Sequence, residues 1–113
     1  MDILLIDDNV EVRKLIKSLL SDLVDHCYEC SDGAEVVEAY RQVQPAWVLM
    51  DIELKQTDGL TATRQLKAAY PSAKVVIVTQ YDDRTLREAA TAAGAWAYIV
   101  KDDLLALREI INS

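Results

Sequence analysis

The chain alternates five times between a short strand-like run and a longer segment in which apolar residues recur every three or four positions. The strand-like runs lie at residues 3–6, 26–30, 47–50, 75–78 and 96–100. Several of them are apolar at successive positions, which indicates a sheet that helices cover on both faces. The alternation therefore predicts an α/β fold with a parallel, doubly wound sheet and right-handed crossovers.

A helical segment follows each predicted strand. In residues 9–23, one buried stripe is predicted from the apolar residues Val12, Leu15, Ile16, Leu19, Leu20 and Leu23. Further helices are predicted from about Gly33 to Pro45, at 58–70, at 83–94 with Gly94 as its C-cap, and at 102–113. Five such units fit an open, flavodoxin-like sheet, because a closed barrel needs eight units and roughly 250 residues.

Length and charge narrow the classes of protein. A chain of 113 residues suits one domain with one core. Its net charge of −7 argues against direct nucleic-acid binding, because phosphate backbones are bound by basic surfaces. No apolar run approaches the roughly 20 residues of a membrane-spanning helix, and the start MDILLIDD lacks the basic lead-in of a signal peptide. We therefore expect a cytoplasmic protein that contacts no membrane.

Two cysteines, Cys27 and Cys30, have the C-x-x-C spacing found in some redox and metal sites. Strand positions three apart point to opposite faces and lie about 10 Å apart, which is beyond disulfide reach. The chain has no second cysteine pair to complete a zinc site. We interpret both cysteines as ordinary strand thiols, the single histidine, His26, as a polar strand-edge residue, and Trp47 as core.

Polar residues follow four of the five predicted strands. The first strand ends in Asp7-Asp8, the third in Asp51, the fourth in Thr79 and the fifth in Lys101. Open α/β sheets bind their ligands beyond the carboxyl ends of the strands. The side chains of these residues are therefore predicted to meet at one rim of the sheet.

Three carboxylates at one rim repel one another. Two like charges 4 Å apart cost about 4 kcal/mol at an effective dielectric constant near 20. A divalent cation offsets this repulsion, and an all-oxygen site that retains water suits Mg²⁺. Beside such an ion, a carboxylate oxygen is able to attack phosphorus, with Lys101 as a second positive charge and Thr79 as a hydrogen-bond donor. The rim therefore predicts phosphoryl chemistry on a carboxylate.

Over essentially its full length the chain resembles bacterial response-regulator receiver domains. The segments that carry the resemblance are LLIDDN, VLMDIELKQTDGL, VVIVTQY and GAWAYIVKDD. The resemblance implies the flavodoxin-like receiver fold, a three-layer sandwich with a five-stranded parallel sheet of order 2-1-3-4-5 and five helices. It also implies one receiver domain at residues 1–113, with an output domain expected beyond residue 113 of the native protein.

The resemblance also implies a metal site. Asp7, Asp8, Asp51 and the backbone carbonyl of Glu53 would hold Mg²⁺, for which Mn²⁺ would be a substitute. Within this set, Asp8 would bind the ion directly and Asp7 would act mainly through a metal-bound water.

Phosphorylation roles follow from the same resemblance. Asp51 would accept a phosphoryl group from a phosphohistidine of a sensor histidine kinase or a phosphotransfer protein, in a two-component phosphorelay. Lys101 would bind the phosphoryl group, Thr79 would be the switch hydroxyl and Tyr98 the switch aromatic residue. The domain would promote its own phosphorylation and dephosphorylation without being a metabolic enzyme.

Three positions depart from the family pattern. Leu54-Lys55 stands where the family usually carries Met-Pro, which predicts a more mobile loop after the third strand. Gln80 replaces a small residue and is predicted to shade the phosphorylation pocket. Asp102 replaces a proline that follows a cis peptide bond, and we expect a trans bond here because a non-proline cis bond costs about 2.5 to 4 kcal/mol.

The surface around the fourth helix, fifth strand and fifth helix is the predicted output surface. Trp96 and Tyr98 are expected on one side of the fifth strand, because strand side chains repeat every two positions. This surface would contact an output domain, a partner protein or a second copy in a phosphorylation-dependent homodimer. The ending VKDDLLALREII is similar to receivers that are joined to LuxR-type helix-turn-helix domains, which indicates transcription regulation.

Three other functions compete with the phosphorylation switch. The first is a receiver-like interaction module that is not phosphorylated. The second is a phosphatase of the haloacid dehalogenase type, which needs an aspartate where this chain has Glu53. The third is a flavodoxin, which needs a Ser/Thr/Gly-rich phosphate loop after the first strand. Gly33 and Gly59 make no such loop and are interpreted as turn or helix-start residues.

Overall fold

Five parallel strands form one sheet in the order β2-β1-β3-β4-β5, as predicted. The computed structural model describes all residues from 1 to 113. The elements follow one another along the chain as β1 (Asp2–Ile6), α1 (Val10–Leu19), β2 (His26–Cys30), the 3-10 helix η1 (Gly33–Glu35), α2 (Val36–Val43), β3 (Trp47–Met50), α3 (Gly59–Ala69), β4 (Val75–Thr79), α4 (Arg84–Ala92), β5 (Ala97–Val100), the 3-10 helix η2 (Lys101–Asp103) and α5 (Leu104–Ile111).

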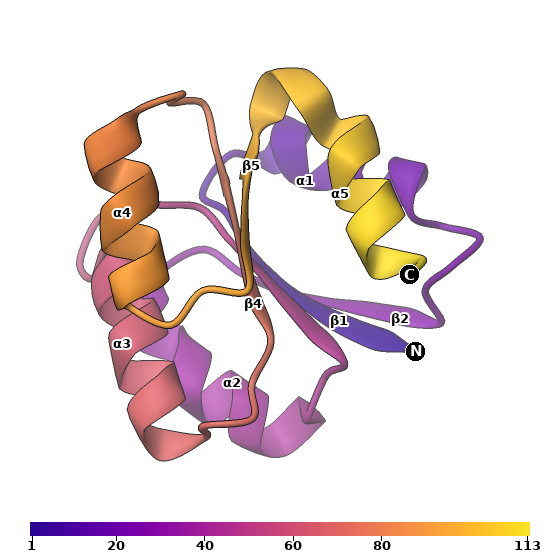
Figure 1. Cartoon of the computed structure of the whole chain (residues 1–113). Coiled ribbons are helices and arrows are strands. Elements are labelled where there is room, and N and C mark those ends of the chain that lie inside the picture. The colour runs from indigo at the N-terminus through magenta and orange to yellow at the C-terminus, as the bar shows by residue number, and fades with distance from the viewer.

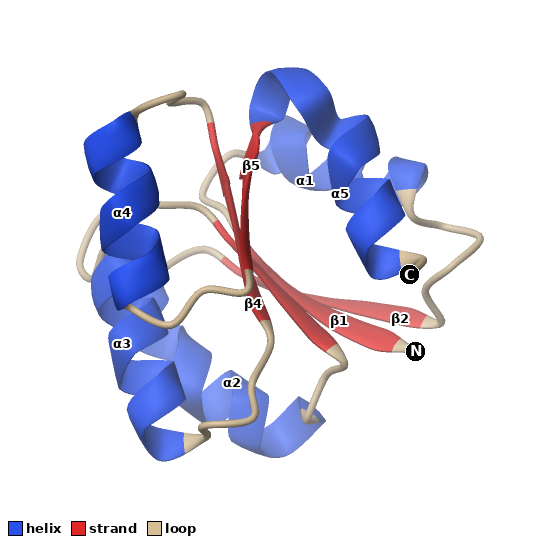
Figure 2. Ribbon diagram, viewed as in Figure 1, coloured by secondary structure: helices blue, strands red, loops and turns tan.

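Helices cover both faces of the sheet and give three layers (Figures 1 and 2). Helices α2, α3 and α4 lie on one face, and α1 and α5 lie on the other. Successive residues of β1 point to opposite faces: Leu4 and Ile6 belong to the core under α2–α4, whereas Ile3 and Leu5 belong to the core under α1 and α5. The two cores explain why the strands are apolar at successive positions. No helix is both long and apolar enough to cross a membrane.

Helix α1 is shorter than predicted and buries a narrower stripe. It ends at Leu19, and the next residues form a turn. Ile16 and Leu20 are buried, but Leu15 is 56% exposed, so its predicted burial is wrong. At about 100° per residue, Leu15 lies roughly 100° away from Ile16 around the helix, at the margin of the covered stripe. The three-residue spacing from Val12 was therefore not sufficient to indicate burial.

Other helix ends agree with the sequence patterns. The carboxylate of Asp58 accepts a hydrogen bond from the backbone N–H of Thr61 and caps α3, and Asp83 caps α4 through the N–H of Leu86. Gly94 follows the C-cap residue of α4 with a φ of 97°, a left-handed conformation that glycine adopts without steric strain.

Strand β2 is an edge strand, and its unusual residues are structural as predicted. Cys27 and Cys30 are both free thiols, and burial raises the pKa of each to about 11, which keeps them protonated and unreactive at neutral pH. His26 is exposed on the same strand, where its Nδ1 lies 3.1 Å from a carboxylate oxygen of Asp2.

Both tryptophans lie at the amino end of the sheet. Trp47 is the first residue of β3 and is only 6% exposed, which confirms that it is core. Trp96 precedes β5 and is 63% exposed, with its ring centroid 5.7 Å from that of Trp47 in an edge-to-face arrangement. The Nζ atom of Lys74 lies 4.9 Å from the Trp47 centroid and 5.5 Å from the Trp96 centroid.

The start of α3 packs against the loop that leaves β3. Gly59, its first residue, donates its N–H to the carbonyl of Ile52 at 2.9 Å. A Cβ atom at Gly59 would lie only 1.9 Å from the backbone oxygen of Asp51, a contact with backbone that no side-chain rotation relieves. Glycine at this helix start is therefore required by a close approach of two backbone segments.

The substitution Gly59→Ala separates this packing argument from helix propensity. Propensity alone would favour alanine by about 1 kcal/mol. We expect the opposite sign, a loss of about 1 to 3 kcal/mol in the free energy of unfolding, because the new methyl group must displace the backbone of Asp51. Urea denaturation measures the change, with Gln65→Ala on the exposed side of α3 as the control. A Gly59→Ala protein as stable as wild type would contradict the expectation.

Candidate functional site

The strand register brings two aspartates together at the carboxyl rim of the sheet. Ile6 pairs with Met50 across β1 and β3, so the residues that follow them, Asp7 and Asp51, lie next to each other. The N–H of Asp51 donates to the carbonyl of Ile6 at 2.9 Å and extends the pairing by one residue. Both carboxylates are nearly inaccessible, with 2% of Asp7 and 6% of Asp51 exposed.

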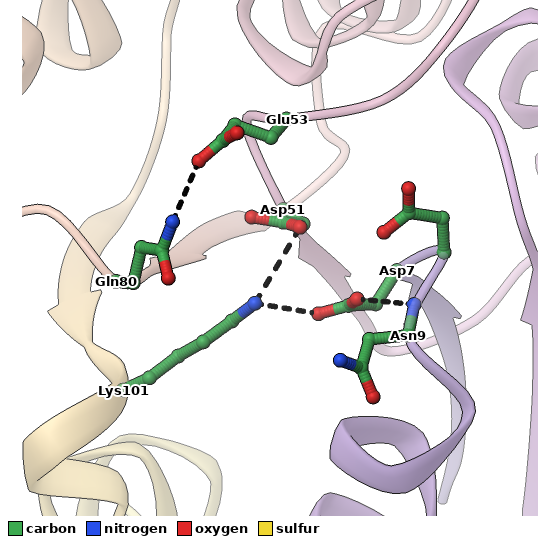
Figure 3. Close-up of a pocket in the computed structure, with 7 residues that line it drawn as sticks. Asp7, Asn9, Asp51, Glu53, Gln80 and Lys101 are labelled. Carbon is green, nitrogen blue, oxygen red and sulfur yellow. Dashed lines mark hydrogen bonds and ion pairs between the residues drawn. The ribbon is translucent and has the colours of Figure 1, made fainter.

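Lys101 joins the two buried carboxylates from the end of β5. Its Nζ atom lies 2.9 Å from Oδ2 of Asp7 and 3.4 Å from Oδ2 of Asp51 (Figure 3). Burial alone would lower the pKa of Lys101, but its hydrogen bond to Asp7 and the negative charges of Asp51 and Asp7 leave that pKa raised. The lysine is therefore a fixed positive charge between two carboxylates.

Ionisation of the Asp51 carboxyl group is disfavoured at this position. Burial and, to a lesser extent, the negative charge of Asp7 raise the pKa of Asp51, whereas Lys101 lowers it, and the net pKa is about 6. A buried carboxylate with a raised pKa beside a like charge is typical of functional sites. An additional cation at this rim would favour the ionised form of Asp51.

Asp8 supplies a third carboxylate, and no other group of the protein pairs with it. Asn9, not Asp8, caps α1, because its Oδ1 accepts the N–H of Val12 at 3.1 Å. Asn9 also donates its own N–H to Asp7 at 2.9 Å. The side chain of Asp8 makes no hydrogen bond or ion pair and is exposed. Carboxylate oxygens of Asp7, Asp8 and Asp51 all lie within 4.8 Å of one another, a donor set that fits a hard divalent cation.

A small polar pocket opens above these groups. Its volume is about 170 Å³, and its lining residues are Asp7, Asp8, Asn9, Asp51, Glu53, Gln80 and Lys101. Gln80 donates its side-chain N–H to Oε1 of Glu53 at 2.8 Å, so the two side chains bridge one side of the pocket (Figure 3). The side chains of Tyr81 and Gln80 hold the pKa of the Glu53 carboxyl below its usual range. Gln80 therefore lines the pocket, where it was predicted to restrict access, and a hydrogen bond to Glu53 holds its side chain there.

Thr79 and Tyr98 meet through the backbone of one residue, Tyr81. Thr79 is fully buried, and its Oγ1 accepts the N–H of Tyr81 at 3.3 Å. The phenol of Tyr98 donates to the carbonyl of Tyr81 at 2.6 Å, and the guanidinium of Arg87 lies 4.6 Å from the Tyr98 ring centroid. Thr79 is not among the residues that line the pocket, whereas its neighbour Gln80 is.

Trp96 and Tyr98 have different neighbours. The Trp96 ring packs against Trp47 at the amino end of the sheet, while the Tyr98 hydroxyl reaches the loop after β4 at the carboxyl end. Strand β5 is at the edge of the sheet, as expected. Trp96 lies just before β5, which begins at Ala97, and not within the strand as predicted, whereas Tyr98 lies within it. The two aromatic side chains have different partners, at opposite ends of the sheet.

The hydrogen bonds that hold the loop from residue 51 to residue 58 were not predicted from the sequence. The carboxylate of Asp32 accepts backbone N–H groups of this loop, and Gly59 closes its base. Sequence reasoning missed Asp32 because its bonds cross 24 and 25 residues of chain, and its DG pair gave only a turn signal. No peptide bond is cis, which confirms the expected trans bond between Lys101 and Asp102.

Known proteins are similar to this chain over most of its length. The family model for the response regulator receiver domain matches residues 3–112. The chemotaxis protein CheY of Halobacterium salinarum is 32% identical over 99 residues, which are 88% of this chain and 82% of the relative.

Solved structures give the same result. A LuxR-family two-component response regulator from Aurantimonas sp. SI85-9A1 matches with a TM-score of 0.86 at 27% identity, over 98% of this chain and 84% of that chain. The BeF3-activated N-terminal receiver domain of Klebsiella pneumoniae RstA matches with a TM-score of 0.86 at 28% identity, over the full length of both.

A haloacid dehalogenase phosphatase and a flavodoxin are excluded by the family match. Receiver domains accept phosphoryl groups and bind Mg²⁺ at a cluster of aspartates, and the acidic cluster of this rim has that composition. The chain thus belongs to the receiver domains of two-component response regulators.

Proposed function

We propose that Asp51 is the phosphoacceptor and that residues 1–113 form one receiver domain that switches an output domain or partner protein. The observation that carries the proposal is the contact of Lys101 with both Asp7 and Asp51. Asp51 combines burial, a raised pKa and a position within reach of the positive charge of Lys101.

The metal site of this proposal consists of Asp7, Asp8, Asp51 and the backbone carbonyl of Glu53. The distances among the three carboxylates support it, and so does the free side chain of Asp8. Mg²⁺, or Mn²⁺ in its place, would neutralise charge on the incoming phosphoryl group. The chain's own contribution is to hold the oxygen ligands in place and to keep the Asp51 carboxylate ionised beside Lys101.

Phosphorylation proceeds by attack of an Asp51 carboxylate oxygen on phosphorus, while the bond between phosphorus and the imidazole nitrogen of the donor histidine breaks. The donor would be a sensor histidine kinase or a phosphotransfer protein. Lys101 then pairs with a phosphoryl oxygen in place of the carboxylate oxygen it now contacts. Hydrolysis reverses the modification when water attacks phosphorus and Asp51 leaves as a carboxylate.

The switch connects Thr79 with Tyr98 through Tyr81. When the Thr79 hydroxyl donates to a phosphoryl oxygen, it moves away from the N–H of Tyr81 that it now accepts. Displacement of Tyr81 changes the acceptor of the Tyr98 hydroxyl, since that hydroxyl bonds the Tyr81 carbonyl. A local charge event is thereby converted into a change at the surface of α4 and β5.

The output surface would be the α4, β5 and α5 surface that carries Trp96 and Tyr98. A transcriptional output is supported by the likeness to a LuxR-family response regulator. The acidic net charge of −7 favours protein partners, including a second copy in the phosphorylated state, over direct nucleic-acid contact. The competing function, a receiver-like module without phosphorylation, differs from this proposal in needing neither Mg²⁺ nor Asp51.

Labelling tests the proposal directly. With a small phosphodonor and Mg²⁺, we expect one phosphoryl group per chain, and peptide mapping by mass spectrometry should locate it on Asp51. Asp51→Ala should abolish labelling, while Asp58→Ala, which removes an aspartate from the same loop, should retain it. Label on another residue, or no label on folded wild-type protein, would favour the module without phosphorylation.

Magnesium binding should depend more on Asp8 than on Asp7. Asp8 has no partner in the protein, whereas Asp7 is already engaged by Lys101 and Asn9. We expect Asp8→Ala to raise the Mg²⁺ dissociation constant about 100-fold and Asp7→Ala about 10-fold, the smaller value being typical of a residue that acts through a bound water. Calorimetric titration measures both constants, and equal losses would refute the ranking.

The phosphoryl group on Asp51 should be long-lived because side chains shade the pocket. Water must approach phosphorus opposite the departing Asp51 oxygen, and we infer that the hydrogen-bonded pair of Gln80 and Glu53, which lines the pocket, obstructs this approach. We expect Gln80→Ala and Tyr81→Ala to shorten the lifetime of phosphorylated protein by at least about twofold, through easier access of water. Gln56→Ala, on the neighbouring loop, serves as the control. Unchanged lifetimes in both variants would rule out shading.

Ionised Asp51 should cost stability in the absence of metal. The pKa of Asp51 is about 6 in the folded protein and 3.8 without the fold, so the folded state disfavours the charged form. The destabilisation is therefore full above pH 6 and disappears as the pH falls toward 4. With a chelator present, we expect Asp51→Asn to be about 1 to 3 kcal/mol more stable than wild type at pH 7.5, with no such gain at pH 4.

Urea denaturation at several pH values measures this difference. The control is Asp102→Asn, which changes an exposed aspartate of the same rim and should give a difference that is small at every pH. A gain for Asp51→Asn that persists unchanged at pH 4 would show that the charge of Asp51 is not its cause.

A further inference from the structure

We propose that Asp32 is a positioning residue of the phosphorylation site, because its carboxylate fixes the loop that follows Asp51 and carries the carbonyl of Glu53. The inference rests on the proposed function of that loop as part of the metal site. Asp32 lies in the turn between β2 and η1, outside the pocket, and contacts none of the rim carboxylates.

The carboxylate of Asp32 binds two separate segments. Its Oδ1 accepts the backbone N–H of Gln56 at 2.9 Å, and its Oδ2 accepts those of Thr57 at 3.2 Å and Ala34 at 2.9 Å. These N–H groups, with that of Lys55, hold the pKa of Asp32 below its usual range. One side chain thus links the turn after β2 to the tip of the loop after β3.

Apart from the hydrogen bond of Gln80 to the Glu53 side chain, the loop has few other restraints. Residues 51–58 form neither helix nor strand, and the bond from Gly59 to Ile52 closes only its base. The N–H groups of Gln56 and Thr57 have no other acceptor among the protein's hydrogen bonds. Without Asp32, the loop would keep the hydrogen bond at its base, but its tip would lose the hydrogen bonds of Gln56 and Thr57.

Close packing shows that the two segments fit each other at this point. A Cβ atom at Gly33, the residue after Asp32, would lie 2.3 Å from the carbonyl oxygen of Thr57. The turn and the loop therefore touch through their backbones. Residues of both segments also line an open hollow of about 310 Å³ that reaches Asp8.

Capping of η1 does not account for this arrangement. A helix cap needs only the bond from Ala34, which is local in sequence, and η1 is a single turn of three residues. The bonds to Gln56 and Thr57 cross 24 and 25 residues. They resemble the outer hydrogen bonds that orient metal ligands in other sites and strongly affect metal affinity.

The sequence of the loop makes this anchor important. Its tip carries Lys55 and no proline, so the backbone is not stiffened covalently there, and the N–H of Lys55 is present as a donor near Asp32. The carboxylate of Asp32 restrains this segment through hydrogen bonds. A loop held at its base and at its tip keeps the backbone around Glu53 in one orientation.

Amide hydrogen exchange on metal-free protein is the first measurement. We expect Asp32→Ala to accelerate exchange in the peptide covering residues 53–57 about tenfold or more, because opening no longer has to break the bonds to the carboxylate. Exchange in β1 and β3 should stay as in wild type. Asp32→Asn, which keeps one acceptor oxygen, should give an intermediate rate.

Magnesium affinity is the second measurement, by calorimetry. We expect Asp32→Ala to raise the Mg²⁺ dissociation constant about tenfold. The matched control is Glu35→Ala, which removes a carboxylate from the same hollow, but one that accepts the N–H of Ser31 in its own turn and no N–H of the loop after β3. It should leave exchange of the loop unchanged and the dissociation constant within about twofold.

Each outcome decides the inference. Unchanged exchange in Asp32→Ala would overturn the inference, because the carboxylate would then not hold the loop. Equal losses of Mg²⁺ affinity in Asp32→Ala and Glu35→Ala would also overturn it and would indicate a general charge effect. If circular dichroism shows that Asp32→Ala does not fold, the comparison of Asp32→Asn with Glu35→Ala decides by the same criteria. Failure of wild-type protein to bind Mg²⁺ would refute the proposed function instead, while the exchange result would still test the anchor.

Discussion

The ion pairs of Lys101 are the interaction on which the rest of the rim depends. The register of β1 and β3 forces Asp7 and Asp51 into adjacent, almost inaccessible positions. Two ionised carboxylates at such a distance would repel by about 4 kcal/mol at an effective dielectric constant of 20. The ammonium at the end of β5 contacts both and offsets part of this repulsion. What remains is a site with a deficit of positive charge, visible in the raised pKa of Asp51, and this deficit is what makes a cation and a phosphoryl group attractive ligands.

The parts of the structure that depend on local pattern were predictable from the sequence. Strands β2 and β3 have the predicted bounds, and the sheet order agrees with the resemblance. The approach of the carboxylates followed from a rule about parallel strands, since Asp7 and Asp51 each come directly after a strand. Leu15 shows the limit of periodicity, because exposure near the margin of a helix stripe depends on how far the neighbouring helix extends over it.

Interactions between distant loops could not be predicted in this way. The bond between Gln80 and Glu53 joins the ends of two strands through flexible side chains, and the bonds of Asp32 join two turns. In each case the partners are ordinary polar residues whose spacing carries no signal. Their meeting depends on the path of the chain outside regular structure, such as the close contact that Gly59 permits. Placement of the reacting groups is thus encoded by the strands, and the shape of the pocket around them by the loops.

The pairing of Trp47 with Trp96 has a practical consequence for optical spectroscopy. The chain has two tryptophans, and both indoles lie at the amino end of the strands, whereas the phosphorylation pocket lies at the carboxyl end. Intrinsic emission therefore originates far from the reacting groups, with a buried and an exposed fluorophore coupled edge to face and an ammonium group beside them. Such emission should change on global unfolding and should not change with substitutions at the rim. It gives the protein a built-in reporter of folding that is optically independent of its chemistry.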